Sequence, residues 1–153
     1  MGLLVGWCRN ALLQPKRELE GLLPDGRRPA DIFLPAWDHG RGVCIDVGVT
    51  CPLQKSFVKR TAKKSGVAAK NYADKKRIFY EDDLARGNLD FVPFVVETLG
   101  GLGAQASKFL GKLANLVAER YSEPPSVTKQ RMLAQLSCCI WRGTGARLDN
   151  RTH

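Results

Sequence analysis

Residues 43–50, with the sequence VCIDVGVT, alternate between two kinds of side chain. One set is wholly aliphatic and consists of Val43, Ile45, Val47 and Val49. The other set is small or polar and consists of Cys44, Asp46, Gly48 and Thr50. Because successive side chains of a β-strand point to opposite faces of the sheet, the alternation predicts a strand with one aliphatic face. Asp46 is then expected on the other face.

A second aspartate, Asp31, opens the apolar segment ADIFL, which predicts a strand ending at Pro35. The segment WDHGRG after it is typical of a loop, and this loop is short enough for the two strands to be neighbours in a sheet. A carboxylate within a buried strand is costly unless it is paired, neutralised or bound to a cation. Two such carboxylates indicate a shared cation. Mg²⁺ or Mn²⁺ is the expected cofactor, with Asp31 and Asp46 as its ligands, since these ions prefer carboxylate, water and phosphate oxygens.

The other segments predict a mixture of helices and strands. A helix is expected over residues 3–14 and an extended piece over 18–23, whereas residues 54–83 have a helical composition with a break at Gly66. Residues 89–98, LDFVPFVVET, are apolar on both faces, which favours a central strand, although Pro93 limits its pairing.

About 40 residues with helices separate the Asp46 strand from this last strand, so a parallel crossover is expected. The chain has 153 residues, of which 44% are hydrophobic, and this suffices for one core. The order of elements predicts an α/β fold with a mixed sheet flanked by helices. We divide it into an N-terminal helical extension (1–17), an α/β core (18–100) and extra C-terminal helices packing on that core (101–153).

Positive charge is concentrated in one stretch. The chain has 24 Lys and Arg against 15 Asp and Glu, a net charge of +9, and residues 55–77 hold nine of the basic residues but only one acid, Asp74. Such a directional patch favours phosphate contact over general solubility. The predicted nucleic-acid-binding residues are Lys55, Lys59, Arg60, Lys63 and Lys64. DNA is the expected partner, with RNA as the alternative.

A lysine often completes a metal-dependent phosphodiester site by orienting water and stabilising charge. Within the helical segment AAKNYADKKRIFY, a stripe at helical spacing combines Ala69, Tyr72, Ala73, Lys76 and Tyr80. Lys76 would then face the sheet, with Lys75 as the runner-up and Lys70 as the third choice. Glu97, at the end of its strand, could complete a metal site, but a helix-capping or surface role is the favoured interpretation.

Four segments are similar to a known family: GRRPADIFLPAW, IDVGVTCPLQ, KKRIFY and FVPFVVETLGG. They resemble the C-terminal part of non-long-terminal-repeat retrotransposon polyproteins, which contains a restriction-like endonuclease of the PD-(D/E)XK type. The resemblance runs from about Glu18 to Arg147. It implies a restriction-endonuclease-like fold, metal binding by Asp31 and Asp46, and a catalytic lysine on the following helix beside a tyrosine.

Carried onto this chain, the catalytic residues are Asp31, Asp46, Lys76, with Lys75 as its alternative, and Tyr80. The implied activity is nicking of one target-DNA strand, whose 3′ end primes reverse transcription, so a reverse transcriptase domain is an expected partner and the nucleus the expected location inside the cell. Gly48 stands where a strand-borne lysine would be.

Two functions therefore stay open: a Mg²⁺-dependent DNA endonuclease, and a nuclease-like module that binds nucleic acid without catalysis. Other classes are disfavoured. The short apolar run at the N-terminus is broken by Arg9 and Pro15, so no signal peptide or membrane span is expected. The five cysteines are scattered, without a Cys-x-x-Cys pair or a histidine cluster, and are expected to be reduced, to serve mostly as packing residues and to bind no zinc.

Overall fold

The computed structural model describes the chain trace over residues 2–149 and the side chains over residues 2–143; the end of the predicted C-terminal segment, residues 150–153, lies outside the described residues. The elements follow in the order α1 (Gly2–Asn10), β1 (Lys16–Arg17), β2 (Ile32–Asp38), β3 (Arg41–Thr50), α2 (Val58–Thr61), α3 (Val67–Arg86), β4 (Leu89–Glu97), α4 (Ala104–Tyr121) and α5 (Pro125–Asp149). The strands form one mixed sheet in the order β1-β2-β3-β4. The predicted α/β class is confirmed.

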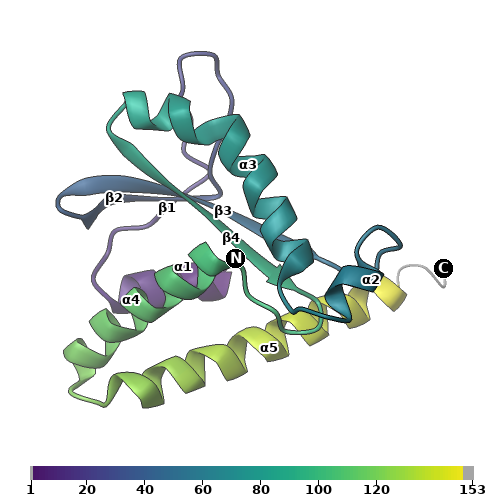
Figure 1. The fold of residues 1–153 in the computed structure, drawn as a ribbon. Coiled ribbons are helices and arrows are strands. Elements are labelled where there is room, and N and C mark those ends of the chain that lie inside the picture. The colour runs from purple at the N-terminus through teal and green to yellow at the C-terminus, as the bar shows by residue number, and fades with distance from the viewer. Residues whose placement is uncertain (1, 150–153) are drawn as a thin grey trace.

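The sheet carries helices on both faces (Figure 1). β1, β2 and β3 are antiparallel, whereas β3 and β4 are parallel and joined through α3, which confirms the predicted crossover. Val43 and Ile45 of β3 face a core shared with α1 and α4, whereas Cys44 packs with Leu84 of α3. The predicted alternation of β3 is therefore confirmed, and Asp46 lies on the α3 side.

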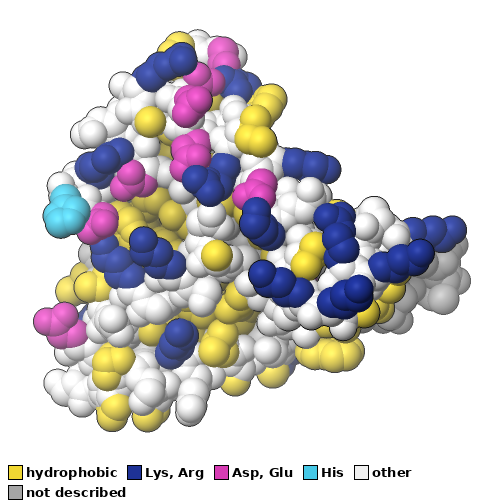
Figure 2. Space-filling model, in the orientation of Figure 1, with side chains coloured by type: hydrophobic (Ala, Val, Ile, Leu, Met, Phe, Trp, Pro, Cys, Tyr) yellow, Lys and Arg dark blue, Asp and Glu magenta, His cyan; other side chains and the backbone are white. Residues whose placement is uncertain are grey.

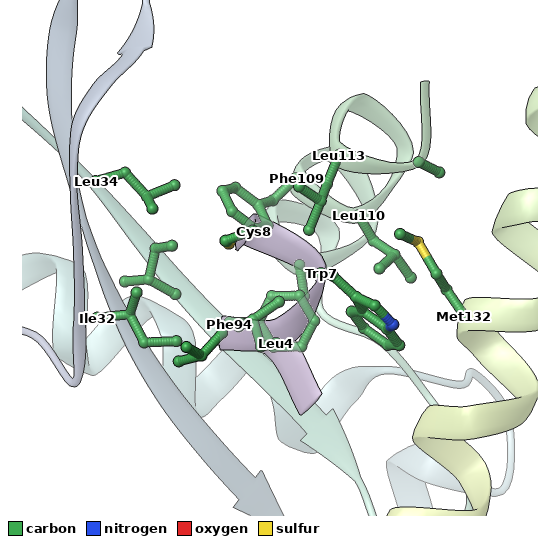
Figure 3. Packing of buried hydrophobic residues seen from close by; sticks show 14 of the residues in the cluster. Leu4, Trp7, Cys8, Ile32, Leu34, Phe94, Phe109, Leu110, Leu113 and Met132 are labelled. Carbon is green, nitrogen blue, oxygen red and sulfur yellow. The ribbon is translucent and has the colours of Figure 1, made fainter. Parts of the chain in front are cut away.

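The main core fills the face opposite α3 (Figure 3). Leu4 and Trp7 of α1 meet Phe94 of β4 and Phe109 of α4, and Met132 of α5 closes the cluster. The N-terminal helix and the C-terminal helices thus share one hydrophobic cluster with the sheet. The division at residues 17 and 100 stays a prediction.

β2 continues past the expected end at Pro35 and reaches Asp38. The prediction was wrong because a proline ends a strand only where its missing N–H is needed in the ladder. β1 pairs only with Ile32 and Phe33, and the register of β2 against β3 shifts between Leu34 and Asp38, so the ladder is interrupted around the proline. The tight turn after β2 uses His39 and Gly40, both with positive φ.

β4 is an edge strand, so the prediction of a central strand was wrong. It reads as apolar on both faces because α3 covers one face and α4 the other, rather than because it has two neighbouring strands. Its outer backbone groups at Val95 and Glu97 bond to Gly103 and Gly101 instead of to another strand. Pro93 is tolerated at this edge since its nitrogen lies on the same side as those outer groups.

Three shorter segments differ from their predicted structure. The first helix, expected to reach residue 14, ends at Asn10, and Leu12 has a φ of 59° that no helix permits. The extended piece expected at 18–23 is irregular, and the strand there is confined to Lys16–Arg17. The basic segment before Gly66 contains only the single helical turn α2.

Gly66 and Glu97 together define the N-terminus of α3. Gly66 precedes it with a φ of 83°, a left-handed conformation that favours glycine, as the predicted break requires. The buried carboxylate of Glu97 accepts a hydrogen bond from Ala69 N–H at 3.1 Å, which satisfies one of the free donors at the helix N-terminus. A side chain at Gly101 would overlap Glu97 Oε2. Of the two roles favoured for Glu97, helix capping is confirmed, whereas the surface role was wrong because the side chain is buried.

α4 and α5 form an antiparallel pair beneath the sheet, and α5 begins at Pro125, a residue suited to the first position of a helix (Figure 1). Across residues 2–149, no helix is long and apolar enough to cross a membrane.

Candidate functional site

Asp31 and Asp46 stand opposite each other on neighbouring chain segments. The antiparallel register pairs Ile32 with Ile45, so the residue before Ile32 faces the residue after Ile45. Asp31 N–H donates to Ile45 C=O at 3.0 Å, and Asp31 Oδ2 accepts from Val47 N–H at 2.7 Å. Cross-strand partners on one face have Cβ atoms about 5 Å apart. The charge of Asp31 also raises the pKa of Asp46, so the two predicted metal ligands are near enough to interact.

Lys76 reaches this pair from α3. Its Nζ lies 3.4 Å from both carboxylate oxygens of Asp46. Lys75, the runner-up, is exposed, and Lys70 forms a surface ion pair with Asp74 at 2.5 Å. The structure thus brings Lys76 to the aspartates and leaves the other two lysines outside. The catalytic role of Lys76 stays a prediction.

Two tyrosine rings flank the Lys76 amine. Its Nζ lies 5.8 Å from the centre of the Tyr80 ring and 5.7 Å from the centre of the Tyr72 ring, within the range of cation–π attraction. Tyr80 was among the predicted catalytic residues, but Tyr72 was not. The signal for Tyr72 was Gly48, a glycine within a strand on the Asp46 face, since such a glycine often marks a close approach.

Tyr72 fills the space that a side chain at position 48 would need. A Cβ atom built on Gly48 would lie 2.6 Å from Tyr72 Cε1 and 2.8 Å from Cζ. Both distances are far inside van der Waals contact, and the ring is held by Ala69, Ala73 and Val95. A strand-borne lysine at position 48 is therefore incompatible with Tyr72 in this place.

The charges at the site act against one another. Burial raises the pKa of Asp46 above its ordinary 3.8; the charge of Lys76 opposes this rise, and the charge of Asp31 adds to it. Burial acts to lower the pKa of Lys76, but the charge of Asp46, helped by Tyr72 and Tyr80, outweighs it and raises that pKa. The lysine therefore stays protonated, while Asp46 carries a charge that its surroundings only partly compensate.

These residues can be tested for their fit to a divalent cation. Asp46 Oδ2 is buried without a hydrogen-bond partner among the described residues, and its only near cation is Lys76. Over the described part of the chain, no group of three or more His, Cys, Asp or Glu side chains could hold a metal ion. The donor set is thus two carboxylates, which fits Mg²⁺ because Mg²⁺ commonly keeps several waters and phosphate oxygens in its shell. It does not fit zinc.

The cysteines contribute no ligands to the site. All five are free; Cys8 and Cys44 are buried, and burial raises the pKa of both thiols to about 12. Their predicted role as reduced packing residues agrees with this burial for these two. Cys51 is half-buried, and the pair Cys138 and Cys139 is exposed.

The five predicted phosphate-binding residues are all exposed: Lys55, Lys59, Arg60, Lys63 and Lys64. We call them the α2 basic patch. None of them forms an ion pair with a carboxylate among the described residues, and Arg60 instead lies over the Phe57 ring. Figure 2 shows basic side chains gathered around α2 at the right of the view, whereas the acidic side chains visible on this face lie to the left of them. The patch follows β3 directly, so it lies at the end of the strand that carries Asp46.

No family model matches this chain, and no curated protein sequence matches it. The expected resemblance to the retrotransposon endonucleases stays a prediction, which rests on the four short segments.

Proposed function

We propose that this chain is a metal-dependent DNA endonuclease of retrotransposon origin, with a restriction-endonuclease-like fold, that hydrolyses one strand of its target. The observation that carries the proposal is the convergence of Asp31, Asp46 and Lys76 on one face of the sheet. These residues come from three separate elements, and a purely structural role would not require two carboxylates to be set opposite each other, which costs stability.

Each residue has a distinct task in this proposal. Asp31 and Asp46 would hold Mg²⁺ or Mn²⁺, which when bound supplies positive charge for the phosphate and lowers the pKa of bound water. Lys76 donates hydrogen bonds to the attacking water or to a phosphate oxygen and stabilises the developing negative charge. Tyr80 holds the lysine amine beside its ring. The α2 basic patch binds the nucleic-acid backbone.

A nicking assay tests the proposal. Supercoiled plasmid incubated with the protein and Mg²⁺ or Mn²⁺ should be converted to the open-circular form. Asp46→Asn should abolish nicking while DNA affinity stays equal or rises, because a negative charge near the phosphates is removed. Cleavage retained by the Asp46→Asn variant would show that the site is not the one proposed here.

A second function is favoured by the burial of Asp46, whose side chain is only 13% exposed and is covered by Lys76. A buried carboxylate that is paired with a lysine suits a module that keeps the nuclease fold but only binds DNA or RNA, or anchors a neighbouring reverse transcriptase domain. This alternative predicts salt-sensitive binding with no turnover at any Mg²⁺ or Mn²⁺ concentration. Nicking that depends on metal and is lost in Asp46→Asn excludes it.

A further inference from the structure

We propose that Tyr72 is a positioning residue that fixes Lys76 against Asp46, and that Gly48 is required because it makes room for the Tyr72 ring. This inference deepens the proposed function and rests on it for its catalytic meaning. Its structural content, which is the control of Lys76 by Tyr72 and Gly48, can be measured without any nuclease activity.

The first observation that supports the positioning role is the contact between β3 and α3. Asp46 and Gly48 lie two residues apart on the same face of β3, so both point toward α3. Opposite them, Tyr72 and Lys76 lie four residues apart on α3 and so share one face of the helix. The four residues form two facing pairs. Lys76 Nζ lies 3.4 Å from the Asp46 carboxylate. The Tyr72 ring occupies the space that a side chain at Gly48 would need.

The second observation is the packing of the Tyr72 ring. Tyr72 is wedged between the bare backbone of Gly48 and the small residues Ala69 and Ala73, which are fully buried. The packed ring forms one wall beside the Lys76 amine at 5.7 Å. Tyr80 forms the second wall one turn further along at 5.8 Å. The flexible lysine is thereby confined to the direction of Asp46, which lowers the entropy that it would otherwise lose on binding there.

Gly48 and Tyr72 together therefore determine which element supplies the amine. With tyrosine at 72, a lysine at position 48 of β3 has no room, and Lys76 of α3 supplies the amine. Any side chain at position 48 displaces the ring and removes one wall of the lysine site.

Amine labelling of the folded protein, read by mass spectrometry, tests the proposal directly. In the wild-type chain Lys76 should react severalfold more slowly than its exposed neighbour Lys75. Tyr72→Ala and Gly48→Ala should both bring Lys76 close to the rate of Lys75, whereas Tyr72→Phe, which keeps the ring, should leave Lys76 protected.

Lys112 is the internal control for general loosening of the fold. It is held elsewhere by Asp38 at 2.8 Å and by the Trp37 ring at 4.6 Å, so its rate should not change in any variant. Unchanged Lys76 labelling in both alanine variants overturns the proposal. A parallel rise at Lys112 also overturns it, because the effect would then be unfolding.

The same variants separate this inference from the proposed nuclease activity. If the wild-type protein nicks DNA, Tyr72→Ala should lower kcat severalfold with little change in KM, and Tyr72→Phe should retain activity. If the wild-type protein does not nick DNA, the nuclease proposal fails while the labelling result still decides the role of Tyr72. Equal kcat in Tyr72→Ala and wild type, with nicking present, contradicts the positioning role.

Discussion

At the scale of single residues, Asp46 lies in an electrostatically unfavourable environment. Its carboxylate is buried, faces the like charge of Asp31, and has one cation, Lys76, at a distance longer than a strong charge-assisted hydrogen bond. Such an arrangement costs stability and is typical of sites kept for function rather than for folding.

The pH dependence of stability follows from this environment. The folded-state pKa of Asp46 lies above its ordinary 3.8, so the folded protein binds this proton more tightly than the unfolded chain does. The cost of ionising Asp46 is therefore absent well below 3.8, develops as pH rises from 3.8 through the folded-state pKa, and is constant above it. Asp46→Asn should be more stable than wild type at pH 7 by about 1 kcal/mol or less, the size of an unfavourable cross-strand charge pair.

Urea unfolding at pH 7 and near pH 4 measures this difference, which should shrink at the lower pH. Asp82→Asn, at an exposed position of α3, is the matched control and should give a small effect at both values. A loss of stability in Asp46→Asn at pH 7 would show that the ion pair with Lys76 outweighs burial.

The thiols give a second prediction at this scale. Because burial raises the pKa of Cys8 and Cys44 to about 12, their thiolate fraction at pH 8 is negligible. Alkylation at pH 8 should modify Cys138 and Cys139 quickly, and Cys8 and Cys44 only at the rate of unfolding. Peptide mass spectrometry after timed quenching checks this order; rapid modification of Cys8 in the folded protein would contradict the core in which it is packed.

At the scale of elements, α3 is placed by Glu97 at its N-terminus and by small residues along its sheet-facing side. Glu97→Ala leaves the buried Ala69 N–H without its acceptor and should destabilise the protein by about 1–3 kcal/mol. Glu97→Gln keeps an acceptor oxygen and should lose much less. Thermal unfolding of both variants tests the cap, and equal stability of Glu97→Ala and wild type would mean that the helix start does not depend on it.

How well an element could be predicted depends on whether its sequence pattern reflects local geometry or the neighbours that pack against it. β3 followed from its alternation, and the break before α3 followed from Gly66, since both depend on local geometry. The edge position of β4 could not be predicted because burial by two helices gives the same apolar pattern as burial between two strands. The extent of β2 was missed because the effect of Pro35 depends on which neighbours pair there.

At the scale of the whole molecule, the candidate site and the α2 basic patch lie along one strand, β3, and its continuation. The convergence of Asp31, Asp46 and Lys76 was expected from strand pairing and helical spacing. The role of Tyr72 was not, because the contact between Gly48 and a ring twenty-four residues later depends on how α3 packs on the sheet.

The basic patch gives a prediction at this scale. If Lys59 and Lys63 each contact a DNA phosphate, replacing both with alanine should reduce the slope of log K against log salt by about 2, since each duplex contact contributes about 0.9. Replacing the exposed Lys16 and Arg17 of β1 removes the same charge at a distance from the patch and should leave the slope nearly unchanged. Fluorescence anisotropy over a salt series compares the two, and equal effects would indicate nonspecific charge attraction.

Direct measurement of Mn²⁺ binding shows whether Asp31 and Asp46 form a divalent-cation site. Electron paramagnetic resonance of free Mn²⁺, with and without a short DNA duplex, should reveal saturable binding by the wild-type protein and its loss in Asp46→Asn, while the exposed-site variant Asp82→Asn binds as wild type does. Equal Mn²⁺ binding by wild type and Asp46→Asn, or no binding by wild type even with duplex present, would contradict the account.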